Sequence, residues 1–436
     1  MSTIESRTDA FLSKWDMKPD SIDMEVLLKK FRTEMEIGLH SEGSSSLKMI
    51  PTYVQVKDEV KKGETVIVID AGGTNLRTCL VSFDEQGTAH IGDFKKISMP
   101  GVKEEVSAKQ FFDVFADEVE RLIDKSDRIG FCFSYAASIT ADHDGIPLVF
   151  SKEIKAPEVI GKAVGANLLA ELAYRGHDVS KKRVSVLNDT VATLLAGKAA
   201  PLAIPYSGYI GFILGTGTNT AYVESNANIL TVPTISGESQ VINIESGNFD
   251  FCPGRLDEEF FASTKQPGQY HLEKMISGAY IGPMSNLVIH KAIEEGILSQ
   301  TFKERFAKYE PINTTVMSNY LEMPFNKDYA LVACTDGNED DARALWLILD
   351  SIIARAAKLT AANLASTVLK SGKGDDPRKP ICINADGTTY YKTEYLKEYT
   401  QYYLHTYLQL ERKRYVNFVR IDDSPIIGAA IAALGL

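Results

Sequence analysis

Two glycine-rich turns, each set between strand-like runs, carry the residues best suited to chemistry in this sequence. The first, DAGGTN (70–75), lies between VIVID (66–70) and RTCLVSF (77–83). Glycines leave the backbone N–H groups of such a turn open to phosphate oxygens, because no side chain blocks the approach. Strand follows strand here, whereas P-loops and dinucleotide-binding loops run from a strand into a helix. The pattern therefore predicts a phosphate-binding hairpin.

The second turn, GTGTN (215–219), repeats this arrangement between YIGFIL (209–214) and TAYVES (220–225). A single glycine-rich hairpin can be an ordinary tight turn, since such turns are common. Two of them indicate a duplicated core, in which each half supplies one loop to the phosphates of a nucleotide. Asp70, at the end of the first strand, is placed to hold a phosphate-bound Mg²⁺ through water.

A third feature is the Asn188-Asp189 pair in VSVLNDTVATLLAG (184–197), where a buried strand gives way to a helix. Asp189 or Thr190 could serve as the N-cap of that helix. Alternatively, Asp189 takes the proton from an attacking hydroxyl, because phosphoryl transfer needs positioning, charge neutralisation and one such base. The two interpretations are compatible, since the end of a strand is a rigid platform.

The elements that must position these residues alternate between strands and helices. Apolar periodicity predicts further strands over 89–97, 129–134, 183–187, 381–384 and 416–421. It predicts helices over 21–40, 110–124, 160–175, 271–296, 339–370, 393–411 and 428–435. A chain of 436 residues suits two domains, and no low-complexity linker separates its halves. We therefore expect an α/β protein whose domains are coupled through crossing segments.

The composition of the chain limits the kinds of molecule that it is expected to bind. The net charge of −11 disfavours nucleic acid and anionic membrane as partners. The five cysteines form no CxxC motif and are expected to be reduced, most of them buried. No run approaches 18 apolar residues, and the first residues have no apolar core of a signal peptide. These observations predict a cytoplasmic protein.

Taken in order, these segments and others resemble the eukaryotic-type hexokinase family over nearly the whole chain. VIVIDAGGTNLRTCLV and IGFILGTGTNTAYVE resemble its two phosphate motifs, and VLNDTVATLLA its catalytic segment. GFCFSYAAS resembles GFTFSFPxS, VFSKEIKAP the segment with Trp-Thr-Lys-Gly-Phe, and INIESGNFD the motif INxEWGxF. QPGQYHLEKMISGAYIG, NADGTTYYKTEYLKEY and DDSPIIGAAIAAL are similar to NPGxxxxEKMxSGxYxG, DGSVYxxxPxFxE and DGSGxGAAL.

The resemblance implies a fold and an activity. The fold would be the two-domain actin-like ATPase fold, a duplicated ribonuclease H-like α/β core with a cleft between a small domain (64–189 plus 424–436) and a large one (1–63 plus 190–423). The activity would be transfer of the ATP γ-phosphoryl group to the 6-hydroxyl of a hexose, giving hexose 6-phosphate for glycolysis. Glucose is the first candidate, with mannose and fructose next. The chain would act as a monomer or homodimer.

The resemblance also implies residue roles, with Asp189 as the general base. The hexose hydroxyls would be bound by Ser134, Ser151, Lys152, Asn188, Asp189, Asn219, Glu245 and Glu273. The ATP phosphates and the nucleotide would be bound by Asp70, Gly72, Gly73, Thr74, Asn75, Arg77, Gly215, Thr216, Gly217, Asp386 and Gly387. Arg77 could equally be a structural ion-pair partner.

Several positions depart from the family motifs. Tyr135 and Ala136 replace a Phe-Pro pair. Phe150 and Ser246 each stand where the family has Trp. The C-terminal Gly-Ser-Gly is replaced by Ser424, Pro425 and Ile426, and nucleotide contacts there are left open. These changes concern the choice of sugar more than phosphoryl transfer.

Three alternatives remain from the sequence. The chain could phosphorylate another sugar such as a hexosamine. It could be a sugar-binding regulator with weak catalysis, although Asp189 and both glycine turns argue against this. It could be an actin-like filament protein, against which the sugar-type segments at 134–152 and 242–273 argue.

Overall fold

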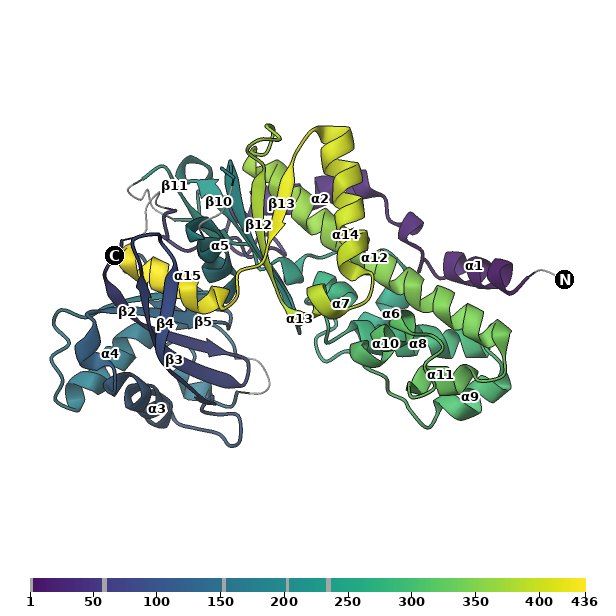
Figure 1. The fold of residues 1–436 in the computed structure, drawn as a ribbon, viewed down its shortest axis with the longest axis horizontal. Helices are drawn as coiled ribbons and strands as arrows, with labels where there is room; N and C mark the ends of the chain where they lie inside the picture. Colours follow the sequence, from purple (N-terminus) through teal and green to yellow (C-terminus); the bar gives the residue numbers. More distant parts are fainter. Residues whose placement is uncertain (1–2, 57–60, 151–153, 201–203, 233–236) are drawn as a thin grey trace.

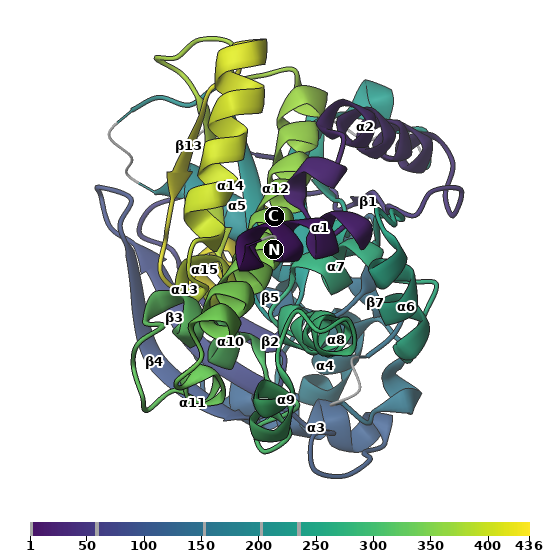
Figure 2. The same ribbon diagram turned by 90° about the vertical axis from the view of Figure 1, so that its right-hand side faces the viewer.

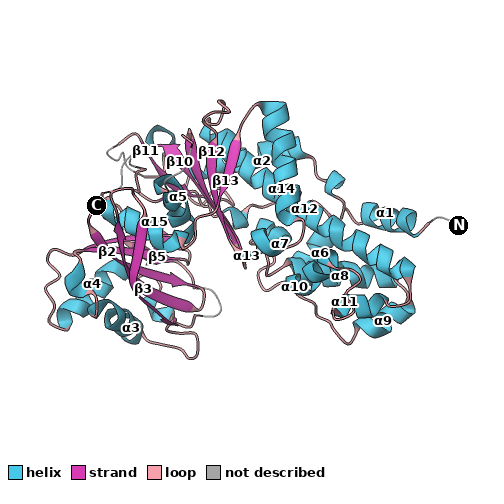
Figure 3. Cartoon of the chain, viewed as in Figure 1, coloured by secondary structure: helices cyan, strands magenta, loops and turns pink. Residues whose placement is uncertain are grey.

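The computed structural model describes residues 3–56, 61–150, 154–200, 204–232 and 237–436, and these form two large β-sheets, with helices around and between them, and one two-stranded sheet (Figure 1). Ser151 and Lys152 lie outside the described residues. Figure 3, coloured by secondary structure, shows two parts of the molecule. The part beside the C-terminus has a strongly twisted sheet, and the larger part extends away from it into a group of helices.

The first sheet has the strand order β4-β3-β2-β5-β8. Its strands are β2 (Thr65–Gly72), β3 (Asn75–Phe83), β4 (Ala89–Ser98), β5 (Arg128–Phe133) and β8 (Arg183–Leu187). β2, β3 and β4 form antiparallel pairs, whereas β5 and β8 run parallel to β2. Ile67 and Ile69 face helices α3 (Ala108–Glu120) and α4 (Val164–Tyr174), and the alternate residues Val66 and Val68 face the interior between the sheets. Both faces are covered, which explains the continuous apolar run.

The second sheet repeats the order as β11-β10-β9-β12-β13, with β1 (Ile50–Pro51) added beside β11. Its strands are β9 (Gly208–Leu214), β10 (Thr218–Ser225), β11 (Ser239–Asn243), β12 (Ile381–Asp386) and β13 (Val416–Val419). As in the first sheet, the first three strands are antiparallel and the last two run parallel to the first of them. The repeated order confirms the duplicated core predicted from the two turns.

Helices α5 (Asp189–Ala199) and α15 (Ser424–Leu434) lie between the two sheets, as Figure 1 shows. α5 packs on β9 and β12, and α15 packs on β2 and β5. The two helices approach closely, because a Cβ on Gly428 would collide with the carbonyl group of Ala192. The shared apolar core between the sheets includes Val191 and Ala430. The two halves of the molecule are therefore joined through this shared core and not by a flexible linker.

Helices cover the outer face of the second sheet, and the view along the long axis shows them gathered around α12 (Figure 2). α12 (Glu339–Ser371) is buried along most of its length against α1 (Ile4–Lys14), α2 (Met24–His40) and α14 (Leu396–Leu404). The chain between β11 and β12 also forms α6 (Arg255–Ser263), α7 (His271–Ile276), α8 (Ile281–Glu294), α9 (Gln300–Phe306), α10 (Thr314–Glu322) and α11 (Ala330–Thr335).

The remaining elements are short. They are β6 (Ala137–Ile139), β7 (Gly145–Pro147), α13 (Thr388–Lys392) and a π-helical turn, His405–Leu410, that continues α14. Single 3₁₀ turns lie at Pro19–Ser21, Ile123–Lys125, Pro157–Val159, Asn226–Asn228 and Ser246–Asn248. Cys79, Cys132, Cys334 and Cys382 are buried free thiols, as predicted, and Cys252 is exposed.

The structure corrects one predicted element. The helix predicted over 271–296 is two helices, α7 and α8, interrupted at residues 277–280. In the interruption the N–H of Gly278 donates to the carbonyl of Gly215 (2.9 Å), and that of Ala279 to Thr216 (3.2 Å). The helical periodicity continues across this break, so the sequence pattern did not reveal a contact made with a distant turn.

Candidate active site

The first glycine turn is a tight hairpin between β2 and β3, as predicted. Gly72 pairs with Asn75, and Gly73 adopts φ = +56°, a conformation that favours glycine. Thr74 is exposed at the tip, and its carbonyl accepts from the N–H of Met99 (3.0 Å). Gly72 is required for another reason, because a Cβ there would lie 2.9 Å from Oγ of Ser134. The loop and the segment after β5 are therefore in contact.

Asp70 is buried below this hairpin and pairs across the strands with Arg77. The Arg77 guanidinium lies 2.5 Å from Oδ2 of Asp70, and Asp70 is 3% exposed. Burial raises the pKa of Asp70, and the charge of Arg77 opposes this rise. Arg77 is thus an ion-pair partner, one of the two roles that the sequence left open, and its place beside the turn is compatible with the other.

Asn188 and Asp189 follow β8, and Asn188 rather than Asp189 or Thr190 is the N-cap of α5. The side-chain oxygen of Asn188 accepts from the N–H of Thr190 at 2.8 Å. The predicted capping role was wrong by one residue, because Asn188 is the residue with extended backbone dihedrals at the strand end. Asp189 is consequently not needed as the cap.

Asp189 lies deep in the molecule but keeps a part open to solvent. Burial raises the pKa of Asp189, a hydrogen bond with Ser134 lowers it, and the charge of Asp70 raises it further. A carboxylate whose pKa is raised by burial is a stronger base than an exposed carboxylate. Ser134, Asp70 and Asp189, from the ends of three neighbouring strands, thus meet at one place.

The second sheet brings a polar cluster to the same place. Nδ2 of Asn219 lies 3.4 Å from Oδ1 of Asn188, 2.7 Å from Oδ1 of Asn243 and 3.1 Å from Oε1 of Glu245. Asn243 also donates to Glu245 at 2.9 Å. Glu245 has φ = +56°, which is rare for a residue other than glycine and often accompanies a functional role. The cluster joins the two sheets through Asn188.

Glu245 and Glu273 both lie in this cluster with raised pKa values. Burial raises the pKa of Glu245, and the charge of Asp189 adds to the rise. Burial also raises the pKa of Glu273, to about 7, although Glu273 accepts a hydrogen bond from the N–H of Thr218 at 3.0 Å. A Cβ on Gly217 would lie 2.5 Å from Oε2 of Glu273, so this glycine allows the carboxylate to approach.

The second glycine turn is held by contacts from three directions. The carbonyl of Gly215 accepts from the N–H of Gly278 (2.9 Å) and from the hydroxyl of Thr389 (2.8 Å). Gly387 follows β12 with φ = +113°, and a Cβ on it would collide with the carbonyl of Leu214. Asp386 accepts from the N–H of Gly387 at 2.7 Å. The segment predicted to bind nucleotide thus lies against the second turn.

Two departures from the family motifs acquire a structural explanation. Ser246 is fully buried and its hydroxyl lies 3.1 Å from that of Thr220, while Asn363 donates to Thr220 at 2.8 Å. The Ser246 hydroxyl is therefore part of a polar contact with α12, while the N–H of Ser246 donates to Oδ1 of Asn219 in the cluster at 3.3 Å. Phe150 packs its ring 5.1 Å from that of Tyr135.

The structure thus gathers most of the predicted residues around one place between the sheets, and it adds Asn243. Asn243 is the last residue of β11 and lies two residues before Glu245 in the segment INIESGNFD, but no sequence pattern pointed to it as part of the site. Within the described ranges, no cluster of three or more acidic, histidine or cysteine side chains could hold a metal ion alone.

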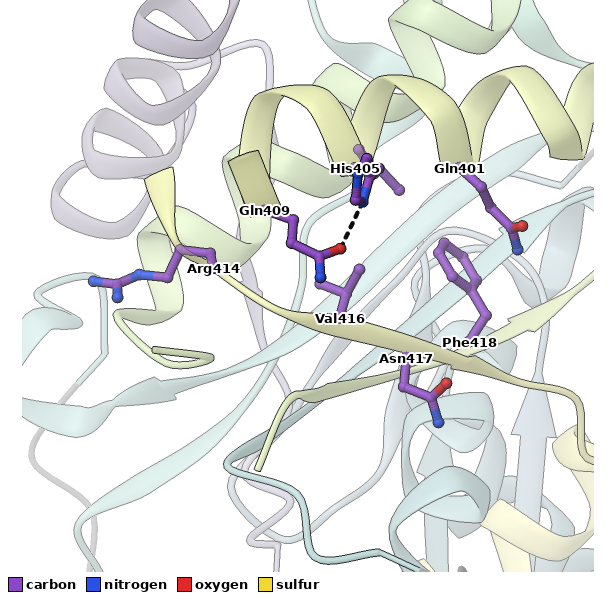
Figure 4. A pocket seen from close by; sticks show the side chains of 8 residues that line it. Gln401, His405, Gln409, Arg414, Val416, Asn417 and Phe418 are labelled. Carbon is purple, nitrogen blue, oxygen red and sulfur yellow. Dashed lines mark hydrogen bonds between the residues drawn. The ribbon is translucent and has the colours of Figure 1, made fainter. Parts of the chain in front are cut away.

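A hollow of about 240 Å³ lies elsewhere, between the π-helical turn and β13 (Figure 4). It is lined by Gln401, Leu404, His405, Gln409, Arg414, Val416, Asn417 and Phe418. Figure 4 shows His405 turned toward Gln409, and their side chains are 2.7 Å apart. None of the predicted site residues lines this hollow.

Two matching sheets with a glycine hairpin each, and buried carboxylates and amides between them, define a phosphotransferase site for a polyhydroxylated substrate. Comparisons with known proteins support this assignment. Family models described as hexokinase match residues 8–199 and 209–435. The chain therefore belongs to the hexokinase family, and its activity is the ATP-dependent phosphorylation of a hexose.

Among curated relatives, the chain is 30% identical to hexokinase-7 of Oryza sativa subsp. japonica, over 92% of this chain and 90% of that protein. It is 28% identical to hexokinase-2 of Solanum tuberosum, over 98% and 91%. It is 29% identical to hexokinase-3 of Mus musculus over 94% of this chain but 45% of that protein, which is about twice as long.

Solved structures of other proteins have the same fold as this chain. A hexokinase from Schistosoma mansoni complexed with glucose superposes with a TM-score of 0.79 and 23% identity, over all of both chains. A ROK hexokinase from Thermus thermophilus superposes with a TM-score of 0.51 and 16% identity over 85% of this chain. The fold is the α/β actin-like ATPase fold predicted from the motifs. None of the helices in the described parts of the chain has the length and apolar character needed to cross a bilayer.

Proposed function

We propose that the chain phosphorylates the 6-hydroxyl of glucose, with Asp189 as the general base. The observation that carries this proposal is the position of Asp189 beside Ser134 and the amide–carboxylate cluster of Asn219 and Glu245. A hexose presents several hydroxyls, and the cluster offers paired acceptors and donors for them. The relative from Schistosoma mansoni was solved in complex with glucose.

In this proposal the carboxylate of Asp189 accepts the proton of the 6-hydroxyl as the hydroxyl oxygen bonds to the γ-phosphorus of ATP. The bond between that phosphorus and the β–γ bridging oxygen breaks, and the bridging oxygen leaves with ADP. Ser134, Asn188, Asn219, Glu245 and Glu273 bind the other hydroxyls, and Asn243 orients Asn219 and Glu245. Ser151 and Lys152 keep the sugar-binding role predicted for them. Water is a competing acceptor, so enclosure of the hexose between the two halves favours transfer to sugar.

The phosphates would lie between the two hairpins. Gly72, Gly73, Thr74 and Asn75 belong to the first, and Gly215, Thr216 and Gly217, with Asp386 and Gly387 beside them, to the second. Mg²⁺ is held mainly by phosphate oxygens and water, and one protein carboxylate suffices for it. Asp70 fits that role through water, since its carboxylate is a buried hard-oxygen group beside the first hairpin. When bound, Mg²⁺ would offset phosphate charge that Arg77 alone cannot neutralise.

Closure would move the two sheets relative to each other. We propose 64–189 with 424–436 as the small domain, and 1–63 with 190–423 as the large one. This division assigns α15 to the first sheet, on which it packs, and gives α5, at the boundary, to the second. The chain is further proposed to work in the cytoplasm as a monomer or homodimer.

A coupled assay of ADP release with ATP and Mg²⁺ tests the substrate. Glucose, mannose, fructose, glucosamine and N-acetylglucosamine are compared at equal concentration, with no sugar as the blank. Highest kcat/KM for glucose is the expected result. Preference for a hexosamine would replace glucose by that sugar, and ADP release equal to the blank with every sugar would contradict the proposed function. Chelation of Mg²⁺ is expected to abolish turnover.

A further inference from the structure

Each glycine hairpin has one carbonyl that accepts a hydrogen bond from a side-chain hydroxyl. The phenol of Tyr135 donates to the carbonyl of Gly73 at 2.7 Å. The hydroxyl of Thr389 donates to the carbonyl of Gly215 at 2.8 Å. In both halves the donor therefore lies outside the hairpin and its acceptor is a glycine within the turn.

The two donors follow corresponding strands of the two sheets. Tyr135 follows β5, the fourth strand of the first sheet, and Thr389 follows β12, the fourth strand of the second. Each fourth strand runs parallel to the strand that enters the hairpin, with Phe133 beside Ala71 and Asp386 beside Ile213. Parallel neighbours end at the same edge of a sheet, so the segment that follows the fourth strand reaches the turn.

At both positions this chain has a hydroxyl-bearing residue where the similar family motif has none. The motif GFTFSFPxS has Phe where this chain has Tyr135, and DGSVY has Val where this chain has Thr389. Neither Phe nor Val can donate a hydrogen bond. The two substitutions thus add the same kind of group after corresponding strands.

A hydrogen bond to a loop carbonyl fixes the orientation of the whole peptide plane. The peptide is planar and trans, so the N–H of the next residue points away from the group that binds the carbonyl. Tyr135 therefore directs the N–H of Thr74 to the opposite side of the hairpin, and Thr389 does the same for Thr216. Phosphate loops bind through such N–H groups, and a donor fixed beforehand loses less entropy on binding.

Both donors are themselves held firmly. The ring of Tyr135 is 5% exposed and lies 4.9 Å from that of Phe133 and 5.1 Å from that of Phe150. Thr389 is 7% exposed, and a Cβ on Gly278 would collide with its hydroxyl. The carbonyl of Gly215 also accepts from Gly278, so both of its lone pairs are occupied.

We propose that Tyr135 and Thr389 are positioning residues for ATP, which orient the N–H groups of Thr74 and Thr216 toward its phosphates. This inference rests on the proposed function of the two hairpins. The two hydroxyl contacts are expected to affect the affinity for nucleotide and to leave the affinity for hexose unchanged.

The test compares Tyr135→Phe and Thr389→Val with Tyr320→Phe. Each substitution removes one hydroxyl and keeps the shape of the side chain. Tyr320 is the matched control, because its phenol donates to a backbone carbonyl, that of Ala342 at 3.0 Å, among the helices α10 and α12. Calorimetry gives the Kd of a non-hydrolysable ATP analogue with Mg²⁺, steady-state kinetics give both KM values, and thermal unfolding gives Tm.

We expect Tyr135→Phe and Thr389→Val each to raise the Kd of the analogue about three- to tenfold, the range for one neutral hydrogen bond. The KM for hexose should not change, and the double variant should show the product of the two factors, because the hairpins are separate. Tyr320→Phe should lower Tm without changing the Kd of the analogue.

An unchanged Kd in both hairpin variants, or an equal rise in Tyr320→Phe, would overturn the proposal. A rise in hexose KM equal to that in Kd would also overturn it, because the hydroxyls would then act on the whole site. Wild-type chain that binds the analogue but phosphorylates no sugar would contradict the proposed function instead, and the Kd values would still decide the role of the two hydroxyls.

Discussion

The two glycine hairpins belong to sheets of the same strand order, yet different groups lie against them. Below the first hairpin, Asp70 and Arg77 form an ion pair across β2 and β3. In the second, the paired residues nearest the turn are uncharged, Leu214 with Thr218 and Ile213 with Asn219. The charged group that contacts the second hairpin is Glu273, which belongs to α7, between β11 and β12.

The two hairpins differ in the segment that connects the third and fourth strands of their sheets. One helix, α3, connects the third and fourth strands of the first sheet, and that hairpin keeps a cation and a carboxylate suited to phosphate and metal. The same connection in the second sheet contains α6 to α12, and it brings Glu273 to the second hairpin. We infer that the first hairpin serves ATP alone, while the second is shared between ATP and the hexose.

The largest difference in activity is expected between variants of the two aspartates at the starts of the helices between the sheets. Asp189 begins α5 after the last strand of the first sheet, and Asp423 precedes α15 after the last strand of the second. Asp189→Asn should lower kcat by about 10²–10⁴-fold, the usual contribution of a general base. Asp423 is exposed, so Asp423→Asn should lower it less than about tenfold. Coupled assays of both variants test this, and equal losses would remove Asp189 from its proposed role.

The next effect concerns the ion pair that only the first hairpin has. Asp70→Asn should leave Arg77 without its partner and weaken metal binding. We expect kcat/KM for ATP to fall about ten- to a hundredfold, the range for a charged hydrogen bond, and the Mg²⁺ concentration at half-maximal rate to rise. Asp84→Asn, directly after the far end of β3, is the control. An unchanged Mg²⁺ requirement in Asp70→Asn would contradict the metal role.

A smaller effect follows from the carboxylate that only the second hairpin has. Burial raises the pKa of Glu273 to about 7 from 4.5, so between these values the folded chain keeps a proton that the unfolded chain has lost. The free energy of unfolding therefore falls as pH rises through this window. Glu273→Gln should raise it by about 1–3 kcal/mol above neutral pH, with little effect below pH 4.5.

Urea unfolding at several pH values measures this difference. Glu304→Gln, an exposed change on α9, should leave the free energy of unfolding unaltered. Glu273→Gln is also expected to raise the KM for hexose. A variant that is stabilised but binds hexose as well as the wild type would show that burial of this carboxylate does not serve the sugar.

The smallest effect distinguishes the reasons why the two turns contain glycine. Gly73 needs its positive φ, and no atom lies within 4 Å of a Cβ there, so Gly73→Asn should cost less than about 1 kcal/mol. Gly217 makes room for Glu273, so Gly217→Ala should displace that carboxylate and raise the KM for hexose severalfold. Unfolding and kinetic measurements of both variants test this, and a larger rise in hexose KM for Gly73→Asn would reverse the argument.

The local chemistry of the site could be predicted from the sequence. The hairpins at 70–75 and 215–219 follow from apolar runs that end in glycine, because glycine tolerates positive φ. The strand before Asp189 and the helix after it follow from the change of periodicity at Asn188. Helices α1, α6, α9, α10 and α11 and strand β11 were not predicted.

The partners of these residues could not be predicted, because they are far away in the sequence. The break between α7 and α8 depends on Gly215, and the buried contact of Ser246 depends on Asn363. The choice of Asn188 over Asp189 as the N-cap depends on backbone dihedrals at the strand end.

The sequence by itself determined the repeated hairpins, the strand-end aspartate and, through ordered motifs, the hexokinase family, because each depends on residues close together in the chain. Tertiary structure decided the environment of each charged group. Burial between the sheets raises the pKa of Asp189, and the charge of Asp70, from another strand, raises it further. Likewise, Tyr135 and Thr389 contact the hairpins only because parallel strands end at the same edge of each sheet.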